Sequence, residues 1–415
     1  IMNDITANPE WSLFLPAFDG DYAAAVHKPA PRALPANLTM ADLNYFSPKS
    51  ALFTYRAGLY SAVYGVKDQQ SGTKTMVSSR DRSQTTVVGD SGGFSVISGV
   101  VKTPLAIFRR QVLDWQEAEC DVGIILDIPT RSTLVPASGY TTFKQCLTAT
   151  EDNVKFALAN RSRSDLILCN VMQGLDTKEA DAWCQTMAPY QKDFEGIALA
   201  GHTRLDLWAW TKRLIKMRDD RQLDRLKWIH VLGTARPGFG LMLTAMQKAL
   251  RKHLDPDIRV SYDSALAFRN VKAHNRITLN WQISDRDFAF GEYRFPANPS
   301  AFDRTKPFPF SSPIGDLSTF GDMNPGNQNS KTGWDTLGLT MLSNHEVFKE
   351  VSAIAEMNRL ADVEGSSRVG STPWHVHKAV EAFDLIWGGS TPGKHLTRFK
   401  KFLGHYGPAT ADDDR

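Results

Sequence analysis

The sequence has few cysteines, no long apolar run and almost no net charge. Its four cysteines lie among 415 residues without a CxC or CxxC pair, which favours buried free thiols in a reducing compartment. No apolar run approaches the roughly twenty residues of a membrane span, and the N-terminal residues predict no signal peptide. We therefore expect a cytoplasmic protein with no membrane partner. The formal charge of +3 neither requires nor excludes a nucleic-acid partner.

The sequence does contain a series of short apolar stretches that each end on a small or polar residue. They are TTVVG before Asp90, GIIL before Asp127, LILCNVM before Gln173, GIALA before Gly201, WIHVL before Gly233 and IRVSY before Asp263. Each stretch is too short for a buried helix and rich in Val, Ile and Leu, as a strand covered on both faces must be. From Asp127 onward they recur roughly every thirty to forty-five residues with helix-like segments between them, which is typical of βα units.

This rhythm predicts an α/β fold, a TIM-type (β/α)8 barrel, because a barrel of about 250 residues with insertions fits within the chain. We expect residues 1–70 to cover one barrel end and residues 71–360 to form the catalytic barrel, with an irregular insertion at 265–333. Within 334–360, a strand-like segment is expected to precede a long helix. Residues 361–415 are expected to form a helical, basic extension. The barrel helices are expected at 104–119, 142–160, 176–190, 205–222 and 238–253.

The strand-end residues are candidates for one shared site, because the chemistry of such barrels lies where the βα loops converge. Asp90 and Asp263 are far apart in the sequence but can lie opposite each other across a barrel. Paired carboxylates suit glycosidic-bond chemistry, in which one attacks the anomeric carbon and the other handles protons. Gly92 and Gly93 permit a turn close to a ligand, and Phe94 offers a flat face for stacking.

Each of these residues also has a structural interpretation when it is taken alone. Asp90, Asp127 and Asp263 fit aspartates that cap helices, close turns or bind a neighbouring loop, and Phe94 fits a core aromatic. A polar residue such as Gln173 can end a strand merely to face water. Independent turns would not be expected to place polar groups at every strand end, so the collective pattern favours a site.

The ordered set GDSGGFSVIS, ILDIPT, NVMQG, FEGIALAGH, IHVLGTARP and SYDSALAF resembles the tRNA-guanine transglycosylase superfamily. The resemblance covers residues 85–270, with a weaker echo at 334–360, and DSGGF is its most specific piece. These enzymes are (β/α)8 barrels that exchange a guanine in a nucleic acid for a 7-deazaguanine. The resemblance thus implies a pentosyltransferase that acts on a base.

The resemblance also implies roles for individual residues. Asp263 matches the nucleophile that attacks C1′ and holds the sugar covalently, and Asp90 matches the general acid/base. The base-binding positions that match are Ser91 in the pocket, Phe94 as the stacking aromatic, Asp127 and Gln173 on the purine edge, Gly201 through its backbone and Leu232 as an apolar wall. Gly233 is then expected to be only a backbone spacer.

Two departures from the family pattern concern the nucleic-acid substrate. The tRNA enzymes carry a structural zinc held by CxC, CxxC and a distal His, but this chain has no cysteine beyond Cys184. Since His345, His375 and His377 alone lack the usual thiolates, we expect no metal and no other cofactor. The loop after the nucleophile also differs, reading SALAFR.

The sequence is more similar to the DpdA-type DNA transglycosylases of bacterial modification systems and phages, which insert a 7-deazaguanine such as preQ0. DNA and a small 7-deazaguanine base are therefore the expected partners, and a homodimer is possible. Arg398, Lys400 and Lys401 are candidate phosphate contacts, although an ordinary solvated helix face explains them equally well. The alternatives are a tRNA-guanine transglycosylase that lacks zinc and a non-catalytic paralogue that binds nucleic acid.

Overall fold

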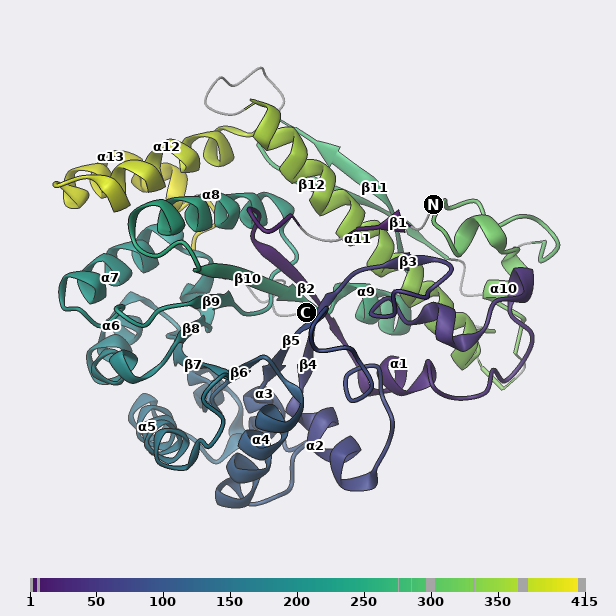
Figure 1. The fold of residues 1–415 in the computed structure, drawn as a ribbon, viewed down its shortest axis with the longest axis horizontal. Coiled ribbons are helices and arrows are strands. Elements are labelled where there is room, and N and C mark those ends of the chain that lie inside the picture. The colour runs from purple at the N-terminus through teal and green to yellow at the C-terminus, as the bar shows by residue number, and fades with distance from the viewer. Residues whose placement is uncertain are drawn as a thin grey trace.

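The centre of the molecule is a closed barrel of eight parallel strands (Figure 1). The computed structural model describes residues 3–5, 8–274, 276–284, 286–295, 303–327, 329–330, 333–364 and 372–409. The barrel strands are β2 (Leu13–Phe18), β4 (Ala57–Ser61), β5 (Thr86–Asp90), β6 (Val122–Ile124), β7 (Ile167–Met172), β8 (Gly196–Leu199), β9 (Trp228–Val231) and β10 (Arg259–Ser264). They follow one another in chain order, and β10 pairs with β2 to close the barrel. The predicted TIM-type barrel is confirmed.

Helices surround these strands. The helices are α1 (Gly20–Ala25), α2 (Ala62–Ser71), α3 (Gly93–Ile97), α4 (Leu105–Glu119), α5 (Phe143–Asn160), α6 (Thr177–Met187), α7 (Leu207–Asp219) and α8 (Pro237–His253). Side chains cap the N-termini of several helices: Thr142 accepts from the Gln145 N–H before α5, and Asp176 accepts from the Glu179 N–H before α6. Short 3₁₀ turns are η1 (Pro35–Asn37), η2 (Met40–Leu43), η3 (Thr130–Leu134), η4 (Pro136–Ser138), η5 (Ala188–Asp193) and η6 (His202–Leu205).

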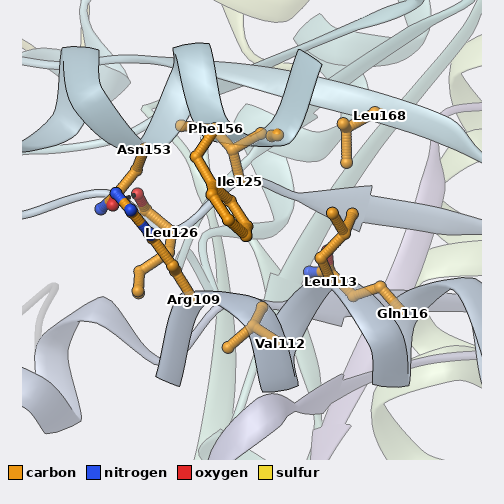
Figure 2. Close-up of a pocket in the computed structure, with 10 residues that line it drawn as sticks. Arg109, Val112, Leu113, Gln116, Ile125, Leu126, Asn153, Phe156 and Leu168 are labelled. Atoms are coloured by element: carbon orange, nitrogen blue, oxygen red, sulfur yellow. Dashed lines mark hydrogen bonds between the residues drawn. The ribbon is translucent and has the colours of Figure 1, made fainter. Parts of the chain in front are cut away.

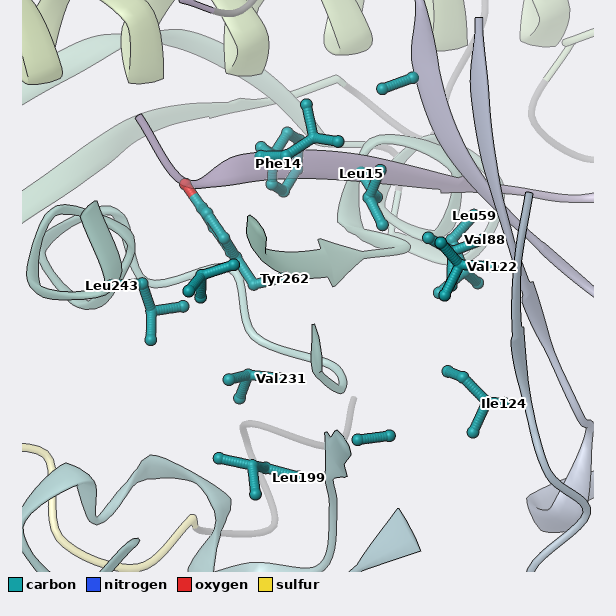
Figure 3. Close-up of a cluster of buried hydrophobic side chains, with 14 of the residues drawn as sticks. Phe14, Leu15, Leu59, Val88, Val122, Ile124, Leu199, Val231, Leu243 and Tyr262 are labelled. Atoms are coloured by element: carbon teal, nitrogen blue, oxygen red, sulfur yellow. The ribbon is translucent and has the colours of Figure 1, made fainter. Parts of the chain in front are cut away.

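Buried apolar side chains pack on both the inner and the outer, helix-facing side of the barrel strands (Figure 3). Leu15, Leu59, Val88, Ile124 and Leu199 are all buried and come from five different strands. Full burial of each such side chain stabilises the fold by about 1.5–3 kcal/mol. The strand ends are therefore held on a rigid, packed scaffold.

The prediction that residues 1–70 only cover the barrel is wrong, because they supply β2 and β4. The proline in LFLPAF argues against a strand, since proline cannot donate to a ladder. In the structure Pro16 is in the last pair between β2 and β10, and the pairs with β4 begin only at Ala17. Pro16 thus lies where the pairing of β2 changes from β10 to β4. A smaller sheet pairs β1 (Asn3–Asp4) with β3 (Phe53–Thr54).

The predicted irregular insertion at 265–333 is partly wrong, because it contains a long antiparallel hairpin, β11 (Arg276–Ile283) with β12 (Phe288–Arg294). Strand β11 alternates polar and apolar residues, and Ile277 and Phe288 are buried. The same region holds α9 (Leu266–Arg269), the π-helical turn η7 (Asn270–His274), η9 (Gly315–Leu317) and α10 (Phe320–Met323).

The segment expected to begin with a strand is instead one long helix, α11 (Thr336–Glu364), beside the hairpin (Figure 1). Asp335 accepts from the Gly338 N–H at its start. Leu337, Met341 and Leu342 follow helical spacing and are buried, so tertiary packing selects the helix.

The chain ends in the expected helical extension, α12 (Trp374–Gly388) and α13 (Pro392–Leu403). Helix α12 packs on α8, and α13 packs on α12 and α7. Beyond α13, the Ala409 N–H donates to the His202 carbonyl in η6, a turn next to the barrel mouth. Within the described residues, no helix is both long enough and apolar enough to cross a membrane.

Candidate active site

Asp90 and Asp263 lie at the carboxyl ends of β5 and β10, on one mouth of the barrel. The Ser61 hydroxyl donates to Asp90 Oδ2 at 3.0 Å, and the Gly92 N–H donates to the same oxygen at 3.2 Å. Burial raises the pKa of Asp90, the Ser61 hydrogen bond lowers it, and the negative charge of Asp263 raises it further, with a net increase. The two carboxylates are therefore electrostatically coupled.

The surroundings of Asp263 differ from those of Asp90. The Gly233 N–H donates to Asp263 Oδ1 at 2.7 Å, and His230 Nε2 lies 3.2 Å from the same oxygen. His230 is fully buried in β9. The expectation that Gly233 is only a spacer is wrong, because its amide contacts the predicted nucleophile. Sequence reasoning missed His230, although a polar residue inside the apolar run WIHVL was a usable signal.

Asp127 and Gln173 come together as expected. Gln173 Nε2 donates to Asp127 Oδ2 at 2.8 Å, and its amide oxygen accepts from the Thr130 N–H at 3.0 Å. Burial, followed by the negative charge of Asp90, raises the pKa of Asp127 to about 7. Because both ends of its amide already have partners, Gln173 orients Asp127 in this structure.

Substituting Asp127 with asparagine is expected to stabilise the fold at alkaline pH. The folded pKa of about 7 lies above the ordinary value of 3.8, so ionising this buried carboxyl weakens the fold as pH rises between those values. Above pH 7 the variant should gain about 2–4 kcal/mol in the free energy of unfolding, and near pH 4 the gain should vanish. Urea titrations at several pH values test this. Asp114→Asn, which removes an exposed carboxylate on α4, is the matched control.

Ser91 and Phe94 frame the same mouth. Ser91 is fully buried, and its hydroxyl makes no hydrogen bond of good geometry within the described residues, although it is close enough to Asp127 to lower that pKa. Phe94 is 56% exposed, with the Arg131 guanidinium 5.7 Å from its ring centre. The alternative of a core phenylalanine is therefore wrong. The Phe94 ring is thus accessible to a ligand, whereas the Ser91 hydroxyl lies buried beside Asp127.

The DSGGF turn explains why small residues precede Phe94. Gly92 has a φ of 74°, which a side chain would strain. At Gly93 a Cβ atom would lie only 2.5 Å from the Asp127 carbonyl oxygen. The two glycines thus let the β5 loop approach Asp127 closely.

Gly201 and Leu232 complete the predicted site at the ends of β8 and β9. Gly201 has a φ of 70°, and a Cβ there would lie 2.7 Å from the Gly174 carbonyl oxygen. Its own carbonyl accepts from Arg204 at 2.9 Å. Leu232 is half-buried and packs against the core.

The buried amide of Gln116 contacts β5 on its outer side. Gln116 on α4 donates to the carbonyls of Gly89 and Ile124, which fixes the strand just before Asp90. A small interior space lies beside Gln116, between α4 and α5 (Figure 2). Its volume of about 10 Å³ admits one water molecule at most, so it is not a base-binding cavity.

The predicted phosphate contacts Arg398, Lys400 and Lys401 lie on α13 and are not among the mouth residues described above. All three are exposed. Arg398 donates to Glu381 at 2.7 Å, and the Lys400 ammonium lies 4.4 Å from the centre of the Trp208 ring. The structure therefore gives a solvated helix face, one side of which packs on α7 and α12.

The potential metal ligands are arranged differently from those considered in the sequence. The four cysteines are all buried, and His345 Nδ1 lies 2.7 Å from the Ser312 hydroxyl. His375 instead approaches Asp287 and His405, with ligand atoms within 4.8 Å of one another. The Tyr406 hydroxyl donates to Asp287 and lies 2.9 Å from His375 Nε2, and the His405 ring stacks on the His375 ring with centres 3.8 Å apart.

Comparison of the chain with family models and with curated proteins found no match. The chemistry of the mouth therefore follows from its residues. Asp263 receives hydrogen bonds on one carboxylate oxygen, while Asp90 has a raised pKa and lies close enough to sense its charge. Such a pair suits one nucleophile and one acid/base.

Proposed function

We propose that this protein is a DNA guanine transglycosylase, which exchanges guanine in DNA for a 7-deazaguanine through a covalent Asp263–deoxyribosyl intermediate. The observation that supports this most is the pair of carboxylates at one barrel mouth, the half-buried Asp90 and the buried Asp263, whose charges interact. A third carboxylate, Asp127, lies close enough to Asp90 for their charges to interact. The motif resemblance supplies the substrate class.

In the first half-reaction, Asp263 attacks C1′ and the bond from C1′ to guanine N9 breaks. Asp90 supplies the proton that neutralises the departing guanine. In the second half-reaction, N9 of the incoming base gives its proton to Asp90 and attacks C1′, which releases the Asp263 carboxylate. Two inversions give net retention, and the proton taken from Asp90 is returned to it.

The remaining mouth residues fit a purine. An ionised Asp127 accepts from the N1–H and N2–H groups of guanine, and Gln173 holds it in place. Phe94 and Leu232 are proposed to enclose the ring, where stacking on an aromatic contributes about 1–3 kcal/mol per base. Ser91 and the Gly201 backbone are proposed to complete the base pocket.

The target nucleotide must be flipped out or unpaired, because a buried Asp263 cannot reach C1′ inside a duplex. Lys400, Lys401 and Arg398 are proposed phosphate contacts outside the mouth, next to the C-terminal segment that is bonded to η6. A small molecule and a nucleic acid would thus meet at the same barrel end.

Exchange assays with duplex DNA, single-stranded DNA and tRNA, run side by side with labelled guanine or a 7-deazaguanine, test the function. Incorporation into DNA, detected by mass spectrometry of nucleosides, is the expected result. Incorporation into tRNA alone would replace DNA by tRNA as substrate. If the protein binds these nucleic acids but exchanges a base in none of them, the alternative of a non-catalytic nucleic-acid-binding protein would hold.

A further inference from the structure

A chain of buried hydrogen bonds runs from β9 through β10 to the predicted nucleophile. Trp228 Nε1 lies 2.7 Å from the Ser261 hydroxyl, which lies 2.8 Å from His230 Nδ1. His230 Nε2 lies 3.2 Å from Asp263 Oδ1. His230 pairs with Ser261 in the ladder, and the four residues alternate along two strands, so they project from the same face of the sheet.

The chemistry of the donors sets the direction of this chain. An indole N–H can only donate, so Trp228 donates to Ser261. The single Ser261 proton is then available for His230 Nδ1, which leaves Nδ1 as an acceptor. This places the histidine proton on Nε2, where it donates to Asp263. The opposite arrangement would bury the Ser261 proton without this partner and turn a lone pair of Nε2 toward a carboxylate.

The carboxylate of Asp263 is also used asymmetrically. Within the described residues, the hydrogen bonds that Gly233 and His230 make to the Asp263 side chain both end on Oδ1. The mouth position of Asp263 then leaves Oδ2 as the oxygen available to a substrate carbon. The asymmetry selects which oxygen attacks.

We propose that His230, held as its Nε2–H tautomer by Ser261 and Trp228, is a positioning residue that fixes Asp263 and assists its departure from the covalent intermediate. This inference rests on the proposed function. When Oδ2 bonds to C1′, Oδ1 becomes the carbonyl oxygen of the ester and keeps both donors. When the incoming base displaces the ester, negative charge returns to the carboxylate, and the same donors stabilise it.

The two half-reactions should therefore respond unequally to loss of His230. A carboxylate without its donor is more basic, hence at least as good a nucleophile but a poorer leaving group. In His230→Ala, resolution of the covalent adduct by incoming base is expected to slow by about 10- to 100-fold, the range for losing a hydrogen bond to a charged group. The adduct should accumulate, and KM for the base should change little.

Quenched single-turnover experiments with denaturing gels measure both steps. His230→Gln, whose amide nitrogen can take the place of Nε2, should restore most of the resolution rate. His253→Gln, on the outer helix α8 and bonded to Asp384, is the matched control and should behave as the wild type. Adduct that resolves at the wild-type rate in a folded His230→Ala protein would overturn the proposal, as would equal slowing of both steps.

A second readout does not depend on activity. Nitrogen-15 NMR of labelled histidine is expected to give the Nε2–H tautomer for His230, with the signal assigned by its loss in His230→Gln. Trp228→Phe removes the fixed donor, so a mixture of tautomers is expected there. An Nδ1–H tautomer in the wild type would overturn the arrangement. If the wild type forms no adduct while this tautomer is found, the proposed function fails and the hydrogen-bond chain stands.

Discussion

Replacing Asp263 by alanine is expected to abolish base exchange and the covalent adduct together. Asp263 is the predicted nucleophile, and its Oδ1 accepts from the Gly233 N–H and lies 3.2 Å from His230 Nε2. Without a nucleophile the substitution at C1′ loses its two-step route, and a loss of about 10⁴-fold or more is expected. The measurement is adduct formation on a denaturing gel together with nucleoside analysis of the product DNA.

The interpretation requires a folded variant that still binds. Asp263→Asn has nearly the same shape as aspartate, so it should bind DNA and the free base while remaining inactive. Asp255→Ala is a suitable control, because Asp255 precedes the amino end of the same strand and contacts Lys227. A folded Asp263→Ala protein that exchanges bases at the wild-type rate would reject the nucleophile assignment.

The site could be predicted from the sequence to the extent that each residue is fixed by local structure. Asp90 and Asp263 lie in the last residues of apolar runs, so the strand pattern alone places them at one barrel end. Asp127 and Gln173 follow their runs in the same way, and the structure brings them into direct contact.

The features that were not predicted from the sequence depend on contacts between residues that are distant in the sequence. Strand β2 contains Pro16, and only its position between two ladders makes that tolerable. His230 and Ser261 acquire their roles by pairing across β9 and β10. Gly233 donates to Asp263 because the loop after β9 folds over the end of β10. None of these relations is encoded in a local pattern.

The carboxylates gathered at the barrel mouth lower the stability of the folded state. Burial, together with the negative charge of a neighbouring carboxylate, raises the pKa of both Asp90 and Asp127. Both carboxyls therefore favour the protonated form more than exposed carboxyls do. The raised pKa values lower the stability of the fold, and in the proposed reaction they favour a carboxyl that can give a proton to the departing base.

Substituting Asp90 with asparagine is expected to slow both half-reactions by about 10²- to 10⁴-fold, the usual contribution of a general acid/base. Because burial raises its pKa, Asp90 stays protonated to higher pH than an exposed carboxyl, and departure of guanine should slow as pH rises through that pKa. Capture of the incoming base needs the ionised form, so it should slow as pH falls.

Asp90→Asn is expected to remove both of these pH dependences, whereas Asp114→Asn is expected to keep them. Quenched single-turnover rates across pH measure each limb, and added formate should partly rescue Asp90→Ala. An unchanged pH profile in Asp90→Asn would assign proton transfer to another group.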